Sequence, residues 1–269
     1  MVRRLGAFFR YAWEIGALAP SFAGRVKVAA AACWLLARVY APRLPPWPVR
    51  VPVLRRGRRL SVALGQYPDL EVVRELYLDG EYPEELEIAD PEVIVDLGAN
   101  IGLALLDFRL RYPQARLIGI EPDPIAFNTL RLNTADDANT EILPVAAAGG
   151  DGVRTFYSSG ESVVSGFART RTFQKPIRVP TKSLDSLMRD LELDAIDVLK
   201  IDVEGAEEEV LGSCTRLADV RTIVGELHTP ALNMPVEEFY RRYLGDFAVE
   251  TTDRRPERCT FVARARRLP

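Results

Sequence analysis

The chain has 269 residues, of which 48% are hydrophobic and 27% charged, proportions that are ordinary for a soluble globular protein. Its three cysteines, Cys33, Cys214 and Cys259, are widely spaced and form no CxxC pair, and His228 is the only histidine. These counts exclude a disulfide framework and a multi-histidine metal site, and they favour the reducing setting of the cytoplasm.

A basic arm is predicted at the start of the chain. The net charge of −3 is unevenly distributed, because the first 60 residues carry about +11 and the remainder about −14. The longest apolar run in the arm, Val28–Ala37, is about half as long as a transmembrane helix requires. We therefore expect a helix that packs against the body or lies on the inner face of a membrane. Five prolines within Pro42–Pro52 predict a linker, which divides the chain into residues 1–52 and 53–269.

From residue 53 onward, strand and helix patterns alternate. The predicted elements are, in order, two short strands about a turn at Gly57, a strand at 92–97, a helix at 101–112, a strand at 115–121, a helix from Pro124 to about Asn133, a strand at 141–147, an insert of hairpin and loop at 150–180, a short helix at 181–191, a strand at 195–203, a helix at 205–213, a strand at 220–227, a helix at 235–244, and strands at 246–252 and 258–264. Such alternation predicts an α/β fold with a Rossmann-like, mostly parallel sheet, closed by a C-terminal antiparallel hairpin.

The first motif is "VIVDLGANIG", where a strand ends at Asp96 and a loop with Gly98, Asn100 and Gly102 enters a helix. Ligands bind beyond the carboxyl ends of such strands, and glycines let the backbone approach them closely. The full G-x-G-x-x-G dinucleotide pattern is missing. An acid that leads into the loop would repel phosphate but suits a positively charged ligand, which favours S-adenosylmethionine.

Charged side chains mark the ends of two further strands. Glu121 ends the strand after the glycine loop, where a carboxylate can accept both ribose hydroxyls of an adenosine. Lys200, Asp202 and Glu204 recur at every second residue, so we expect them on one face of a strand that ends near Val203. Because burying unpaired charges is costly, they are expected to pair with one another and with a ligand at the rim of a site.

A fourth segment, "GELH", places Glu226 and His228 on one face at the end of the next strand. A neutral imidazole there could take a proton from a hydroxyl acceptor, with Asp202 as the second choice of base. Asp202, Glu204 and Glu226 could also form a carboxylate site for magnesium. We expect no metal to be required.

Together, "VIVDLGANIG", "GIEPDP", "DVLKIDVEGAEEEVL" and "GELH" resemble, in order, the FkbM-like family of S-adenosylmethionine-dependent methyltransferases, over roughly residues 65–262. The upstream segment with Tyr77 and Tyr82 is similar to the approach to the family's first strand. The resemblance implies a class I methyltransferase fold and O-methylation of sugars, polyketides and related metabolites. It implies the cofactor-binding residues Asp96, Gly98, Ala99, Asn100, Gly102, Glu121 and Pro122, and the acceptor-facing residues His228, Asp202 and Glu204.

The expected partner is a hydroxylated small molecule or glycan, with the acceptor pocket built from the 150–180 insert and the N-terminal segment. The basic arm adds a possible contact with a membrane surface, whereas nucleic acid is not expected because the body is acidic.

Other functions stay open. A nicotinamide-dependent oxidoreductase would need a glycine where Asn100 stands, and usually has a catalytic Y-x-x-x-K pair. This sequence contains no Y-x-x-x-K pair. A nucleic-acid base methyltransferase would want an [ND]-P-P-[YF] segment, also absent. A non-catalytic binding module with the same fold is the remaining alternative, and binding of the cofactor without turnover would support it.

Overall fold

The structure is a computed structural model, and it describes residues 12–80, 86, 88–158 and 175–266. A seven-stranded sheet in the order β11-β12-β10-β9-β3-β4-β5 forms its centre. Its strands are β3 (Val93–Leu97), β4 (Arg116–Ile120), β5 (Thr140–Leu143), β9 (Ile196–Ile201), β10 (Val220–Leu227), β11 (Phe247–Arg254) and β12 (Cys259–Ala265). All neighbours pair in parallel except β12, which is antiparallel to both β10 and β11. The predicted α/β class and closing antiparallel hairpin are confirmed.

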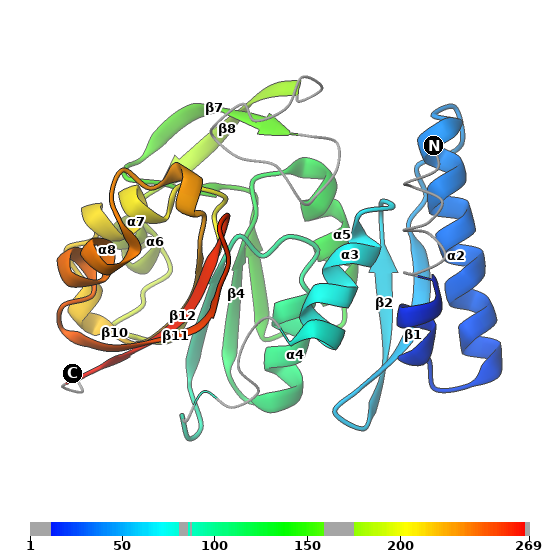
Figure 1. Ribbon diagram of the computed structural model, residues 1–269, viewed down its shortest axis with the longest axis horizontal. Helices are drawn as coiled ribbons and strands as arrows, with labels where there is room; N and C mark the ends of the chain where they lie inside the picture. Colours follow the sequence, from blue (N-terminus) through cyan, green and yellow to red (C-terminus); the bar gives the residue numbers. More distant parts are fainter. Residues whose placement is uncertain (1–11, 81–85, 87, 159–174, 267–269) are drawn as a thin grey trace.

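Helices cover both faces of the sheet (Figure 1). One face carries α3 (Asp69–Arg74), α4 (Leu103–Arg111) and α5 (Pro124–Thr134), and the other carries α6 (Leu184–Asp190), α7 (Glu207–Ser213) and α8 (Val236–Tyr243). Along β3 the side chains alternate, so that Ile94 joins the first core and Val95 the second. Short single turns of helix occur at Glu75–Asp79, Leu217–Asp219 and Thr229–Ala231.

Local signals explain where several helices begin. Asp123 accepts hydrogen bonds from the backbone N–H groups of Ile125 and Ala126, and Pro124 occupies the first helical position of α5. Ser183 caps α6 by accepting from the N–H of Ser186. The start of α5 agrees with the predicted Pro124, whereas α6 begins at Leu184 and not at 181, because residues 181 and 182 belong to a strand.

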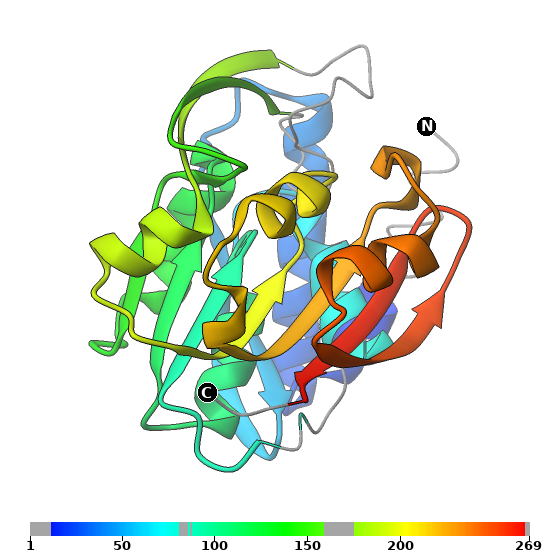
Figure 2. The ribbon, with the colours of Figure 1, turned by 90° about the vertical axis from the view of Figure 1, so that its left-hand side faces the viewer.

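The strand expected at 141–147 is interrupted at Pro144, which has no N–H to donate to a ladder. Its second part, β6 (Ala146–Ala147), leaves the central sheet and pairs with β8 (Lys175–Lys182), which in turn pairs with β7 (Gly152–Ser158). The β7–β8 ribbon rises beyond one end of the central strands (Figure 2). The rest of the predicted insert, residues 159–174, lies outside the described residues, as does Tyr82.

The segment before the main sheet forms a helix and a hairpin. Helix α2 (Phe22–Tyr40) packs beside β1 (Val49–Arg55), which pairs with β2 (Arg58–Leu64) about a turn in which Arg56 and Gly57 both have positive φ. The start of the predicted arm, residues 1–11, is not among the described residues. No helix within 12–80, 86, 88–158 and 175–266 is long and apolar enough to cross a membrane.

Candidate active site

Four neighbouring strand ends meet at one edge of the central sheet. Strands β10, β9, β3 and β4 are consecutive and parallel, so their carboxyl ends lie at the same edge. The strand order reverses between β3 and β9, because β4 lies on one side of β3 and β9 on the other. Open α/β sheets bind their ligands at such a switch point.

A cavity of about 550 Å³, open to solvent at its mouth, lies at this switch point. The predicted site residues that line it are Gly98, Asn100, Glu121, Pro122, Asp202 and Glu204, and the other lining residues are Ala146, Ala147, Phe156 and Val203. The lining does not include Asp96, Ala99, Gly102 or His228.

The glycine loop passes very close to the end of β9. Gly98 has a φ of 84°, and a Cβ atom on it would lie 1.8 Å from the carbonyl oxygen of Asp202. The backbone N–H groups of Gly98 and Ala99 donate to the carbonyl of Ile120, at 3.0 and 2.9 Å. Gly102, with a φ of 86°, precedes the first residue of α4. Ala99 and Gly102 therefore hold the loop in place without lining the cavity.

Asp96 and Lys200 form a buried ion pair beneath this loop. The Lys200 Nζ lies 2.9 Å from Asp96 Oδ1 and 3.6 Å from Asp202 Oδ2, and it donates to the carbonyl of Gly98 at 3.2 Å. Burial raises the pKa of Asp96 and the charge of Lys200 opposes that rise. The pair thus joins β3, the glycine loop and β9 from below.

Glu121 is a buried carboxylate at the wall of the cavity. Its Oε2 accepts from the N–H of Asn100 at 2.8 Å, and its Oε1 accepts from the N–H of Asp123 at 2.7 Å. Burial raises its pKa to about 8, the charge of Asp123 adds to the rise, and the two backbone hydrogen bonds oppose it. The two backbone hydrogen bonds therefore fix the side chain at the lining of the cavity.

The loop after β9 carries Asp202 and Glu204. The strand ends at Ile201, two residues before the predicted end, and the N–H of Asp202 donates to the carbonyl of Leu97 at 3.0 Å. Glu204 and Gly205 both have positive φ, 54° and 97°. Burial raises the pKa of Glu204 to about 8, and nearby carboxylates raise it while His228 opposes the rise. Helix α7 then begins at Glu207 and not at the predicted 205.

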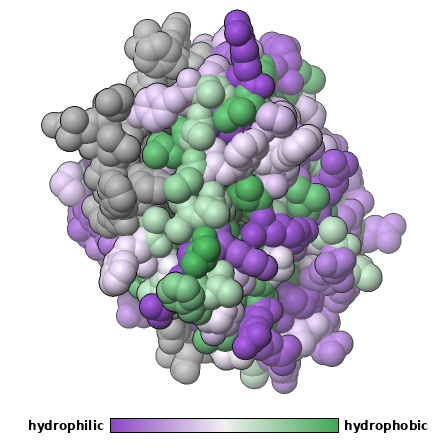
Figure 3. Space-filling view, turned by 90° about the vertical axis from the view of Figure 1, so that its right-hand side faces the viewer, coloured by the Kyte–Doolittle hydropathy of each residue, from purple (hydrophilic) through white to green (hydrophobic). Residues whose placement is uncertain are grey.

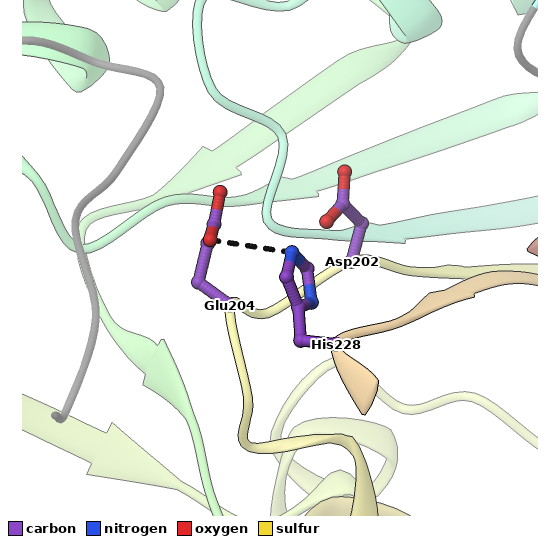
Figure 4. A group of neighbouring side chains, drawn as sticks. All are labelled: Asp202, Glu204 and His228. Carbon is purple, nitrogen blue, oxygen red and sulfur yellow. Dashed lines mark ion pairs between the residues drawn. The ribbon is translucent and has the colours of Figure 1, made fainter. Parts of the chain in front are cut away.

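His228 lies against Glu204, beside Asp202 (Figure 4). Its Nε2 is 3.2 Å from Glu204 Oε2 and 3.6 Å from Glu226 Oε1, and its Nδ1 is 2.8 Å from Glu207 Oε1. Glu207 is fully buried, and the same oxygen accepts from the N–H groups of Val203 and Gly205.

These contacts give His228 a positive charge. Burial lowers its pKa, but the hydrogen bond to Glu207 and the charges of Glu207, Glu204 and Asp202 outweigh burial and raise the pKa to about 10. The ring is therefore protonated at neutral pH, with both nitrogens donating. This differs from the neutral imidazole expected from the sequence, because the fully buried Glu207 was not foreseen.

One atom from each of Asp202, Glu204 and His228 could hold a metal ion, since these atoms lie within 4.8 Å of one another. Carboxylate and imidazole ligands suit several divalent metals. The magnesium site considered from the sequence had Glu226 in the place that His228 takes in this set. In the structure, Nε2 of His228 is already paired with Glu204.

An open groove of about 1300 Å³ adjoins the cavity at Glu204, which borders both. Its lining includes Arg154 from β7, Glu208 and Glu209 from α7, and Tyr243 from α8. These side chains offer hydrogen-bonding groups and one aromatic ring. Among the described residues, the insert contributes to this region through β7, whereas the N-terminal segment lines neither the cavity nor the groove.

Two residues at the site carry no clear signal in the sequence. Glu207 is one of three consecutive glutamates, and only the start of α7 at that position separates it from its neighbours. Phe156 lies in the insert, and β7 is tied to the site by a 2.6 Å hydrogen bond from the Ser158 hydroxyl to Asp123. All three glutamates lie in the first turn of α7, so an acid at a helix start does not by itself identify Glu207.

Comparison with known proteins gives a family. Residues 96–252 match the family model described as the methyltransferase FkbM domain. The chain is 28% identical over 194 residues to methyltransferase sdnD of Sordaria araneosa, covering 60% of this chain and 74% of that protein. It is 32% identical over 158 residues to the 2-O-methyltransferase NoeI of Sinorhizobium fredii, covering 52% and 65%. It is 29% identical over 190 residues to the 31-O-demethyl-FK506 methyltransferase FkbM of Streptomyces tacrolimicus, covering 67% and 68%.

Solved structures give more distant matches. A precorrin-6y methyltransferase of Geobacter metallireducens matches with a TM-score of 0.42 and 14% identity, covering 66% of this chain and 82% of that one. A ribosomal-RNA methyltransferase of T. thermophilus, solved with AdoMet and guanosine, matches with a TM-score of 0.44 and 16% identity, covering 84% and 53%.

Proposed function

Because this chain belongs to the methyltransferase FkbM domain family, we propose that it transfers a methyl group from S-adenosylmethionine to a hydroxyl of a sugar, glycolipid or secondary metabolite. The observation that carries the proposal is the cavity at the switch point, which has Glu121 on one wall and Asp202 and Glu204 on another. Two relatives are named for O-methyl chemistry, NoeI as a 2-O-methyltransferase and FkbM as the methyltransferase of a 31-O-demethyl compound.

The residues that line the cavity fit the proposed cofactor. Glu121 offers carboxylate oxygens to the two ribose hydroxyls. Gly98 and Asn100 bring the backbone to the cavity surface, and a Cβ atom at Gly98 would strike the end of β9. Asp202 and Glu204 bring carboxyl oxygens to the same cavity, where they can contact the cationic end of the molecule.

S-Adenosylmethionine would supply an electrophilic methyl group on a sulfonium. The task of this chain's residues is to hold the acceptor oxygen in line with that carbon and to keep water away, which is where much of the acceleration of such a transfer arises. Because Glu204 borders both the cavity and the open groove, we place the acceptor in the groove, with its reacting hydroxyl beside Glu204 and Asp202.

The acceptor hydroxyl has to lose its proton as it attacks, and Asp202 is our first candidate for the base. Its carboxylate lines the cavity and is one-quarter exposed, at 26% of its side-chain surface. Lys200 Nζ lies 3.6 Å from its Oδ2. His228 does not line the cavity and is held by carboxylates at both ring nitrogens, so we assign it the role of fixing Glu204.

The first experiment is a calorimetric titration with S-adenosylmethionine, S-adenosylhomocysteine and NAD. We expect the two adenosyl ligands to bind and NAD not to bind. Glu121→Gln should weaken binding by about tenfold or more, because it leaves one ribose hydroxyl without an acceptor, which costs roughly 1–3 kcal/mol. The control is Glu141→Gln, an exposed glutamate on β5 of the same sheet, which should leave binding unchanged. Binding of NAD alone by the folded protein would contradict the cofactor assignment.

The second experiment tests the base. Once a screen of labelled methyl transfer to sugars, glycolipids and polyketides has given an acceptor, Asp202→Asn should lower kcat by about 10²- to 10⁴-fold with cofactor affinity changed far less. Asp194→Asn, an exposed aspartate before the opposite end of β9, is the control. A kcat within threefold of the parent would remove Asp202 from this role. Cofactor binding without transfer to any acceptor would favour a binding module.

A further inference from the structure

The N-terminal helix and hairpin carry a strongly one-sided charge. From Ile15 to Pro68 the sequence contains nine lysines and arginines and no aspartate or glutamate. The whole chain has a net charge of −3, so the rest of the molecule is acidic. Two of the nine, Arg55 and Arg56, pair with Asp107, whereas Arg25 and Lys27 are exposed on α2.

The same segment exposes apolar side chains. Of the eleven large hydrophobic residues that are exposed among the described residues, seven lie between Trp13 and Leu54. The most exposed are Trp13 and Phe22, each at 81%, and Trp47 at 68%. Scattered exposed hydrophobic residues are normal in proteins, but such a concentration in one segment marks an interaction surface.

Helix α2 is apolar on both of its faces. One face, with Val28 and Leu35, is buried against the hairpin and the core. The exposed residues Phe22, Val26, Ala29, Cys33, Ala37 and Tyr40 recur every three or four positions and therefore form a second face. Lys27 and Arg25 fall on opposite sides of this exposed face when the residues are placed at 100° intervals.

Phe22 and Tyr40 lie at the two ends of this face, and Trp13 and Trp47 are exposed in the segments before and after α2. Phe22 begins α2, with Trp13 nine residues earlier in the chain, and Tyr40 ends it. Arg38 near that end donates to the carbonyl of Trp47 at 3.4 Å. Figure 3 shows this side of the molecule, where a band of hydrophobic residues lies beside hydrophilic ones. We call the set Trp13, Phe22, Val26, Tyr40, Trp47, Arg25 and Lys27 the basic aromatic face.

We propose that the basic aromatic face lies on the surface of a membrane rich in anionic phospholipid, so that the protein binds that surface peripherally. Aromatic side chains favour the headgroup region, and each lysine or arginine near an anionic leaflet strengthens binding by roughly fivefold. No helix in the part of the chain that the structure describes could cross the bilayer, which is consistent with a helix that lies in the plane of the surface.

Lipid fits this face better than a second copy of the chain or a nucleic acid does. In a twofold dimer built on α2, each copy would bring the same positive surface to the other, because Ile15 to Pro68 contains no acid to pair with its cations. Nucleic acid offers phosphates to the basic residues but gains little from an aliphatic stripe of valine and alanine. An anionic bilayer offers negative charge and an apolar boundary together.

The test is co-sedimentation of the full chain with vesicles of phosphatidylcholine alone or with 30% phosphatidylglycerol, a proportion on the order of that in anionic membranes. We expect binding to the anionic vesicles only, and a fall in binding between low and high salt. Arg25→Glu with Lys27→Glu, and separately Trp13→Ala with Phe22→Ala, should each lower the partition coefficient by about tenfold or more.

Matched controls lie on the body. Arg241→Glu with Arg242→Glu makes the same change of charge on the exposed side of α8. Ile125→Ala with Val153→Ala removes exposed apolar side chains from α5 and β7. Both should bind like the parent, and all variants should keep the parent's circular dichroism.

The proposal is overturned if the control variants lose binding equally, if neutral vesicles bind as well, or if no vesicle is bound. It is also overturned if the face variants instead abolish a dimer or RNA binding. The result is independent of the proposed methyl transfer, because no assay of activity is involved.

Discussion

A single buried carboxylate, Glu207, organises the loop after β9 and the ring of His228. One of its oxygens accepts from His228 Nδ1 at 2.8 Å and from the N–H groups of Gly205 and Val203 at 3.1 and 3.3 Å. It therefore fixes the loop that carries Glu204 and, at the same time, the ring that contacts Glu204. The strained positive φ of Glu204 is held from both sides.

The charge of His228 gives a direct prediction, since it is the only histidine and its ring signals in an NMR spectrum need no assignment. Its pKa of about 10 lies above the ordinary 6.5, so its charge stabilises the fold fully below pH 6.5 and progressively less as pH rises through 10. We expect the ring to remain protonated at pH 7.5, and Glu207→Gln to lower the titration midpoint by at least about one pH unit.

Glu208→Gln provides the matched control, because this neighbouring glutamate contacts Asn233 and Tyr243 instead of the ring. Its midpoint should equal that of the parent. A parent midpoint between 6 and 7 would contradict the assigned contacts.

Sequence reasoning at this scale identified most of the residues that line the cavity but not their charge states. Asp202, Glu204 and Glu121 were recognised because an acid at a strand end is conspicuous. Glu207 was not, because nothing in three consecutive glutamates tells which one faces inward. The charge of His228 depends on that one buried partner.

The end of β9 is joined to β3 by the buried pair of Lys200 and Asp96. Lys200 exposes 5% of its side-chain surface to solvent and Asp96 exposes 0%. Lys200 also reaches the glycine loop through the carbonyl of Gly98. The two strands that border the switch point are therefore held together beneath the cavity.

Removing one partner of this pair should be costly. Lys200→Met leaves the buried Asp96 carboxylate unpaired and should lower the free energy of unfolding by about 3–5 kcal/mol, measured by urea denaturation. Adding Asp96→Leu should restore most of the loss, because it removes the orphaned charge. Lys182→Met, at a more exposed ion pair, should cost less than about 1 kcal/mol. Equal effects of the two lysine substitutions would argue against a structural role for the buried pair.

The ends of the strands show what sequence periodicity cannot predict. Alternation indicated that Lys200, Asp202 and Glu204 share a face, but β9 ends at Ile201, and the latter two side chains project from a loop. Pro144 could be read as a break because it cannot donate to a ladder, yet only the tertiary pairing of β6 with β8 shows where the chain goes next. The order of strands in the sheet depends on such long-range contacts.

At the scale of the whole molecule, the N-terminal helix belongs to the main core. Val28 and Leu35 of α2, Val53 of β1 and Ile94 of β3 lie in one continuous apolar cluster. Arg55 of the hairpin pairs with Asp107 of α4 at 2.7 Å. The proline-rich segment that predicted a linker joins elements that share this core.

This packing predicts one unfolding transition for the arm and the body. Leu35→Ala, at a side chain that is 1% exposed, should lower the free energy of unfolding by about 2–5 kcal/mol while a single transition is kept. Val26→Ala, 52% exposed on the same helix, should change it by less than about 0.5 kcal/mol. Circular dichroism during denaturation measures both. Two separate transitions would show instead that residues 1–52 fold as a unit of their own.

The three tryptophans of the chain, Trp13, Trp34 and Trp47, all lie before the central sheet. Trp13 and Trp47 are largely exposed, whereas Trp34 packs against the core. None of them lines the cavity or the adjoining groove. Tryptophan fluorescence of this protein therefore reports the surroundings of its N-terminal helix. Two of the indoles are exposed to solvent and one packs against the core. A ligand in the cavity or the groove would contact none of them.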